Sequence, residues 1–335
     1  MRPQFTLHGL DLDLGGWFQV GWSDELAPGD VAAKRYFAQD LVIYRGLDGR
    51  LQAHDRYCRH LGASLAHGGV VVDDGIQCPF HGWVWGPDGR NVCIPYQDRP
   101  NGSRTLRSWP VCERNEAIYL WNDPAGGEPS WQVADAVTLA PHAAASTFHP
   151  AGPHARSHFT DLRVHPQMVA ENAVDRHHFQ FVHRTPISPV VLDQRVDGPT
   201  WFSRVGFGRR WSDEVAAGNG ISDDSANTIE ILFQGLGVSV NTEHMRDGIR
   251  VIAINTTPVD DQRTELFATY WIDERDGDLA DGSYQRRLDE AKNALPDDVQ
   301  IWDNQIYLDS PALATSEARG FSDLRRWSSQ FFPTS

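Results

Sequence analysis

The chain has 335 residues, of which 22% are charged and 40% are apolar. At roughly 150 residues per domain, this length predicts two globular domains. Thirty Lys and Arg against 45 Asp and Glu give a formal net charge of −15, which excludes nucleic acid as a partner because its phosphates would be repelled.

The N-terminus and the hydropathy of the chain bear on its compartment. The first 16 residues contain no apolar run of signal-peptide length, and no stretch of 18 apolar residues occurs that could span a membrane. Four cysteines are too few for a disulfide scaffold. We therefore expect a cytoplasmic protein without a membrane segment, in which the cysteines are reduced thiols or metal ligands.

Short strands and turn signals alternate between Trp17 and about Trp121. Three β-hairpins are predicted about Asp-Gly turns, and they cover residues 41–55, 68–78 and 83–96. A further strand is expected at 117–123. Strands this short and closely spaced favour a small antiparallel barrel or sandwich.

The rest of the chain mixes helices with longer strands. After a Pro- and Gly-rich linker at 122–130, we expect a strand at 158–165 and one helix over 166–183. Four antiparallel strands and two helices follow, at 200–208, 228–234, 249–258, 265–273, 283–294 and 297–309. The predicted fold class is α+β, with an N-terminal antiparallel β domain over 1–125 and an antiparallel sheet with helices over 126–335.

The strongest signal is a pair of Cys/His motifs on two turns of the β domain. Cys58-x-His60 is followed, after 17 residues, by Cys78-x2-His81. A zinc finger usually has two Cys in one arm and two His in the other, whereas each arm here has one of each. This order fits a Rieske [2Fe–2S] centre, in which Cys58 and Cys78 would hold one iron and His60 and His81 the other.

The alternative is a structural Cys pair with unrelated surface histidines. The two spacings and the flanking Gly and Pro residues make the cluster the better interpretation. Cys93 and Cys112 lie outside the pattern, and we expect both to be small buried apolar side chains. We expect His54 and His67, which are off the spacing, to be surface or hydrogen-bonding residues.

A second candidate metal site lies in the predicted helix 166–183, which contains Asp175-x2-His178-x4-His183. Asp175 and His178 share one helix face, but His178 and His183 are separated by ~500° on a regular helix. Both can bind one metal only if the helix ends or bulges between them. His177 is the poorer partner for His183, and we expect it to face solvent.

Two His and one carboxylate form the facial triad of non-haem Fe(II) oxygenases, so a carboxylate must come from elsewhere. Asp297 and Asp298, after Pro296, are the best source, although the helix dipole alone also favours acidic residues at a helix start. Aromatic side chains would either line a cavity at this iron or pack in the core of the sheet, and the candidates are Trp201, Phe207, Phe233 and Trp271.

These segments resemble the oxygenase component of Rieske non-haem iron oxygenases, and in particular 3-ketosteroid 9-alpha-hydroxylases and the related cholesterol-desaturase branch. The resemblance is carried by YCRHLGASL, CPFHGWVWGPDGR with IPY, AENAVDRHHFQFVH, and DDVQIWDNQIYLDSPAL with LRRWSSQFF. It implies a helix-grip-like C-terminal sheet. It also implies His178, His183 and Asp298 as ligands of a mononuclear Fe(II), and Asp175 as the catalytic bridge between the two metal centres.

The resemblance further implies hydroxylation of a small apolar substrate, steroid-like, terpenoid or polycyclic, with O2. NAD(P)H would act indirectly, through a separate flavin/iron–sulfur reductase or a ferredoxin, because the chain has no Gly-x-Gly-x2-Gly nucleotide fingerprint. An acidic surface would steer a basic face of that partner. The family also implies a homotrimer, in which each Rieske domain docks head-to-tail on the neighbouring catalytic domain.

Two other classes of function stay open. One is a Rieske electron-transfer protein without oxygenase activity, and the other is a binding module in which zinc is structural. Within the oxygenases, demethylation, desaturation and aromatic dihydroxylation are alternatives to hydroxylation.

Overall fold

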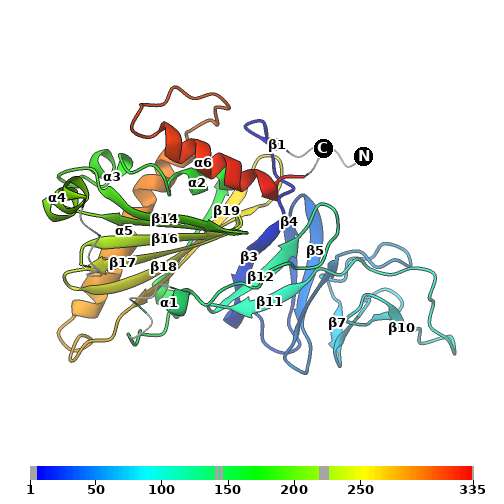
Figure 1. Ribbon diagram of the computed structural model, residues 1–335. Coiled ribbons are helices and arrows are strands. Elements are labelled where there is room, and N and C mark those ends of the chain that lie inside the picture. The colour runs from blue at the N-terminus through cyan, green and yellow to red at the C-terminus, as the bar shows by residue number, and fades with distance from the viewer. Residues whose placement is uncertain (1–5, 140–142, 144–145, 219–225, 334–335) are drawn as a thin grey trace.

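The computed structural model describes residues 6–139, 143, 146–218 and 226–333. It has two parts, an N-terminal part built of small sheets and a C-terminal part built around one large sheet (Figure 1). None of the helices in these ranges is long and apolar enough to cross a membrane.

The N-terminal part is antiparallel β structure, as predicted. The three expected hairpins are β5–β6 (Gln39–Arg45, Leu51–Asp55), β7–β8 (Val70–Val72, Gly75–Gln77) and β9–β10 (Val84–Trp85, Asn91–Cys93). The remaining elements are β1 (Thr6–Leu7), β2 (Leu10–Asp11), β3 (Gly16–Trp22), η1 (Ser23–Glu25), β4 (Val31–Tyr36), β11 (Val111–Arg114) and β12 (Ala117–Asn122). The expectation for the two outlying cysteines is wrong, because Cys93 is exposed and Cys112 is half-buried.

The C-terminal part is a seven-stranded antiparallel sheet in the order β13-β19-β18-β17-β16-β15-β14. Five of its strands match predicted ones: β13 (Arg156–Leu162), β15 (Thr200–Gly206), β16 (Thr228–Gln234), β18 (Gly248–Pro258) and β19 (Thr264–Ile272). Strands β14 (Val190–Asp197) and β17 (Val238–Met245) were not predicted. In β17 polar side chains occur on both faces, so the alternation that identifies a strand is absent.

Helices cover this sheet and its edges. They are α1 (Ala136–Leu139), η2 (Pro153–Ala155), α2 (Pro166–Glu171), α3 (His178–Phe181), α4 (Arg209–Ala217), α5 (Ser283–Trp302), α6 (Ala318–Ser328) and η3 (Ser329–Phe331). The prediction of two helices separated at Pro296 is wrong, because α5 is continuous and contains Pro296. Pro296 removes one backbone hydrogen bond, but Leu295 and Val299 are both buried in the same apolar cluster and hold the helix on the sheet.

Buried polar contacts join the two parts. The Asn255 side-chain amide donates to Gln19 Oε1 at 2.8 Å and to Tyr119 Oη at 3.1 Å, and the Thr257 hydroxyl donates to the carbonyl of Gln19 at 2.6 Å. Asn255 and Thr257 alternate along β18 with Ile252 and Ile254, which line a cavity. One face of β18 therefore holds the N-terminal part, and the other faces the cavity.

We expect the Arg287→Met substitution to lower the free energy of unfolding by about 3–5 kcal/mol. Arg287 is 1% exposed, and its guanidinium bonds to the carboxylates of Asp273 and Asp278, the latter at 2.7 Å. Its loss leaves buried carboxylates without their partner. Urea unfolding would measure the change. The matched control is Arg286→Met, since Arg286 is 60% exposed and 3.8 Å from Glu290. Equal effects of the two substitutions would contradict the prediction.

Candidate active site

Two similar turns present the Cys/His motifs. The backbone N–H of Gly62 donates to the carbonyl of Cys58 at 2.9 Å, and the N–H of Gly82 donates to the carbonyl of Cys78 at 3.1 Å. Both glycines have positive φ, +79° and +70°, which a side chain would disfavour. Each turn therefore folds back on its cysteine and presents one thiol and one imidazole on the same side.

The side chains on these turns form a Cys/His pocket in which the thiols are buried and the imidazoles are half-buried. Cys58 and Cys78 are 2% and 3% exposed, and burial raises the pKa of the Cys58 thiol. The Trp85 indole N–H donates to Cys58 Sγ at 3.3 Å. The rings of His60 and His81 lie 4.8 Å apart, and the buried Nδ1 of His81 has no hydrogen-bond partner. Two buried thiols beside an unpaired imidazole nitrogen fit a [2Fe–2S] cluster, which would bind that nitrogen and keep the thiols ionised.

The second candidate site forms where the predicted helix 166–183 is interrupted. Helix α2 ends at Glu171 and α3 begins at His178, so the prediction of one helix is wrong over 172–177. The Asp175 carboxylate accepts hydrogen bonds from the backbone N–H groups of His177 and His178 at 3.1 and 3.2 Å. Because these are the donors at the start of α3, the Asp175 carboxylate caps this second helical segment.

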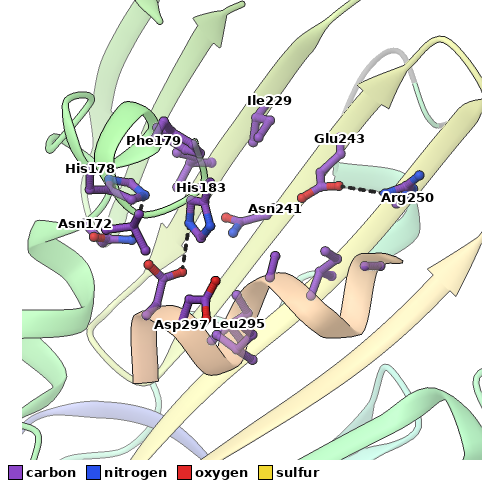
Figure 2. Close-up of a pocket in the computed structure, with 18 of the residues that line it drawn as sticks. Asn172, His178, Phe179, His183, Ile229, Asn241, Glu243, Arg250, Leu295 and Asp297 are labelled. Atoms are coloured by element: carbon purple, nitrogen blue, oxygen red, sulfur yellow. Dashed lines mark hydrogen bonds and ion pairs between the residues drawn. The ribbon is translucent and has the colours of Figure 1, made fainter. Parts of the chain in front are cut away.

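The interruption brings the two histidines to the carboxylate of Asp298. The ligand atoms of His178, His183 and Asp298 all lie within 4.8 Å of one another, and His183 Nε2 is 3.3 Å from Asp298 Oδ2 (Figure 2). In the described part of the chain, this is the one set of three or more His, Cys, Asp and Glu side chains that is compact enough for a single ion. No three of the ligand atoms of Cys58, His60, Cys78 and His81 meet the same 4.8 Å limit, which fits a two-iron cluster better than a single zinc ion.

Hydrogen bonds and burial prepare this triad for a metal. His178 Nδ1 bonds to the carbonyl oxygen of Asp175, which can only accept, so Nδ1 carries the proton and Nε2 keeps its lone pair. Burial lowers the pKa of His178, and the hydrogen bond to Asp298 raises the pKa of His183. A neutral imidazole, a second imidazole and a carboxylate are the donors of a facial triad, so the residues fit a mononuclear iron.

Neighbouring acidic and imidazole side chains are not part of this triad. Asp297 lines the adjoining cavity, and Asp303 accepts a hydrogen bond from the backbone N–H of Arg163 at 2.7 Å. His177 is half-buried and hydrogen-bonds to Ser188 Oγ at 2.9 Å, so the expectation that it faces solvent is wrong. A shared helix face would let the Asp175 carboxylate accept a hydrogen bond from the His178 imidazole, but that interpretation is wrong, because the imidazole bonds to the Asp175 carbonyl.

A cavity of about 680 Å³ adjoins the triad, between the sheet and α5. Two of the four aromatic candidates, Phe207 and Phe233, line it. Trp201 and Trp271 belong to the core, where Trp201 packs 5.8 Å from Trp327. Several polar residues of the lining were not predicted, among them Asn172 in the turn 172–177, Asn241 and Glu243 on β17, and Arg250 on the neighbouring strand β18.

This combination of a buried Cys/His pocket and a three-ligand site at a cavity defines a Rieske non-haem iron oxygenase. Residues 16–110 match the Rieske [2Fe-2S] domain family, and residues 120–332 match the 3-ketosteroid 9alpha-hydroxylase C-terminal domain family. The chain belongs to this 3-ketosteroid 9alpha-hydroxylase family of Rieske oxygenases.

Individual relatives agree with this assignment. The chain is 30% identical to "Cholesterol 7-desaturase nvd" of Xenopus laevis, over 95% of this chain and 71% of that protein. It is 28% identical to "3-ketosteroid-9-alpha-monooxygenase, oxygenase component" of Rhodococcus rhodochrous, over 95% and 80%. The crystal structure of dicamba monooxygenase bound to dicamba has the same fold, with a TM-score of 0.65 at 17% identity over 94% of this chain and 98% of that one.

We expect Asp298→Ala to remove about one of three irons per chain and to abolish oxygenation, because it takes one ligand from the triad. The Rieske spectrum should survive, since the Cys/His pocket uses other residues. Iron analysis and electron paramagnetic resonance would measure both. The control is Asp303→Ala, because Asp303 lies directly after the end of α5 and bonds to the backbone N–H of Arg163 instead of the triad. Full activity in Asp298→Ala would instead implicate Asp297.

Proposed function

We propose that this enzyme hydroxylates a C–H bond of a steroid-like or other polycyclic apolar molecule. The observation that carries the proposal is the cavity, which the triad adjoins and whose walls include Phe179, Ile229, Ile231, Phe233, Ile252 and Ile254. Its volume of about 680 Å³ lies in the range of small-molecule sites. The names of the relatives point to steroids, which are apolar and polycyclic.

Each group of residues has a defined part in this proposal. Cys58, Cys78, His60 and His81 would hold the [2Fe–2S] cluster, and His178, His183 and Asp298 the iron. The bound iron supplies the activation of dioxygen, with electrons that come from NAD(P)H through a separate reductase or ferredoxin. The apolar walls hold the substrate by burying its surface and exclude water from the reacting carbon.

Turnover of the iron-loaded enzyme with a surrogate reductase, NADH and a panel of steroids, terpenoids and polycyclic aromatics tests the proposal. Hydroxylation adds one oxygen to the mass of the product. Desaturation is the second candidate, because one relative is named a cholesterol 7-desaturase, and it removes two hydrogens. Demethylation and dihydroxylation give their own mass changes. Reduction of the cluster without any product from the panel would favour an electron-transfer protein and overturn the proposal.

The distribution of charge bears on the reductase. The matched Rieske segment 16–110 contains ten Lys and Arg and ten Asp and Glu, so the net charge of −15 belongs to the rest of the chain. The excess of acidic residues is therefore not distributed evenly along the chain. We propose that a basic partner would be drawn to the catalytic part, whereas the Rieske segment itself gives no such attraction.

We further propose a homotrimer in which domain 1–125 of one subunit docks on domain 126–335 of the next. Exposed apolar side chains stand beside both metal sites: Leu61 and Phe80, at 66% and 61% exposure, adjoin His60 and His81 in sequence. Phe181, at 79%, lies between His178 and His183. Two different apolar faces support a head-to-tail contact, which closes in a ring.

In this assembly Asp175 would connect the centres. Its carbonyl bonds to His178, while its carboxylate uses Oδ1 to cap α3. Within the described part of the chain, Oδ2 accepts no hydrogen bond, so it could accept one from a Rieske imidazole of the neighbour, His81 being the proposed donor. Such carboxylates orient metal-bound histidines and tune their basicity.

We expect Asp175→Asn to keep both metal centres and the trimeric mass but to lose nearly all turnover. Asn still caps α3, while the negative charge of the bridge is gone. Rieske oxidation, followed in single-turnover mixing with substrate and dioxygen, should stall. The control is Asp135→Asn, because Asp135 Oδ1 caps α1 with the same pattern of hydrogen bonds. Near-normal Rieske oxidation in Asp175→Asn, or a monomeric active enzyme, would contradict the bridge.

A further inference from the structure

The floor of the cavity is formed by side chains of the three neighbouring strands β16, β17 and β18. Residues 239, 241, 243 and 245 of β17 all face the cavity, as alternate residues of a strand do. Asn241 lies between Ile231 and Ile252, and Glu243 lies between Ile229 and Arg250. The central strand is therefore polar, while the strands on both sides are mainly apolar.

Glu243 is an acidic residue of this floor with few polar contacts. The Arg250 guanidinium, 10% exposed, contacts Glu290 at 2.7 Å and Asp247 at 3.1 Å but Glu243 only at 4.0 Å. The Glu243 carboxylate accepts no hydrogen bond from any residue that the structure describes. Burial raises its pKa, against the effect of Arg250. A half-buried carboxylate that makes one long ion pair and no hydrogen bond has unused acceptor capacity, and its exposed side faces the cavity.

We propose that Glu243 is a specificity-determining residue that accepts a hydrogen bond from a hydroxyl group of the substrate. The inference rests on the proposed function, in that the cavity must be the substrate site. Glu243 and Arg250 lie on the far side of Asn241 from His183 (Figure 2). The substrate would therefore be an elongated apolar molecule, with a hydroxyl at one end and the oxidised carbon at the other.

The carboxylate of Glu243 distinguishes a hydroxyl from a ketone. A ketone has no proton to donate, so it would face the carboxylate oxygens without a hydrogen bond. A neutral hydroxyl satisfies Glu243 and leaves the contacts of Arg250 with Glu290 and Asp247 in place.

The test compares two steroids that differ only in a hydroxyl against a ketone on the first ring, epiandrosterone and androstanedione. Dissociation constants are measured by calorimetry on the iron-loaded wild-type protein, on Glu243→Gln and on the control Asp247→Asn. Asp247 contacts the same guanidinium but does not line the cavity. A hydrogen bond to a carboxylate corresponds to about tenfold in affinity or more.

We expect the wild type to bind epiandrosterone at least about tenfold more tightly than androstanedione. Glu243→Gln should lose most of this preference by weakening the hydroxyl ligand alone, and Asp247→Asn should keep it. Equal affinities in the wild type, or a preference that survives Glu243→Gln, would overturn the role of Glu243 and leave the proposed function standing. Absence of binding by both steroids to the wild type would overturn the steroid-like substrate and this inference with it.

Discussion

The active site depends on the interruption of a helix between Glu171 and His178. On an unbroken helix, the imidazoles of His178 and His183 would point in directions ~140° apart and could not share one ion. Asp175 fixes the far end of the interruption in two ways: its carboxylate binds the backbone N–H groups that open α3, and its carbonyl holds the ring of His178. One residue thus sets both the direction of the chain and the tautomer of a proposed ligand.

The third member of the triad is positioned over a longer distance. Helix α5 crosses the sheet for 20 residues, and its buried side chains, including Leu288 and Leu295, share one apolar cluster with strands β18 and β19. Near its beginning, Arg287 joins it to Asp273, directly after β19. Because the helix is fixed along its length, Asp298 near its end is held against His183. Stability at one end of α5 and ligand geometry at the other are therefore linked.

Chemistry was easier to predict from the sequence than backbone geometry. The Cys58/His60 and Cys78/His81 spacing is local, so the turns that bring these side chains together could be inferred from short segments. The meeting of His178, His183 and Asp298 was expected from their types and the family resemblance, while the turn at 172–177 depends on capping contacts that periodicity does not encode. Pro296 predicted a helix boundary. The helix continues through it because the burial of Leu295 before Pro296 and of Val299 after it outweighs the loss of one backbone hydrogen bond. Strand β17 was missed because polar side chains occur on both of its faces, Asn241 and Glu243 on one and Thr242 and His244 on the other, so the apolar/polar alternation of a strand breaks down.

The polar residues that break the strand pattern of β17 are informative about function. A strand selected only for stability would present apolar residues to the space under α5, as the neighbouring positions Ile229 and Ile252 do. Asn241 and Glu243 instead place polar groups there, and burying a carboxylate costs free energy unless it is paired and hydrogen-bonded. Arg250 offsets only part of that cost, because its shorter contacts go to Glu290 and Asp247. The fold thus keeps an incompletely paired carboxylate at a place where a bound ligand can supply the missing hydrogen bond. Such a site is one where selection for activity outweighs selection for stability.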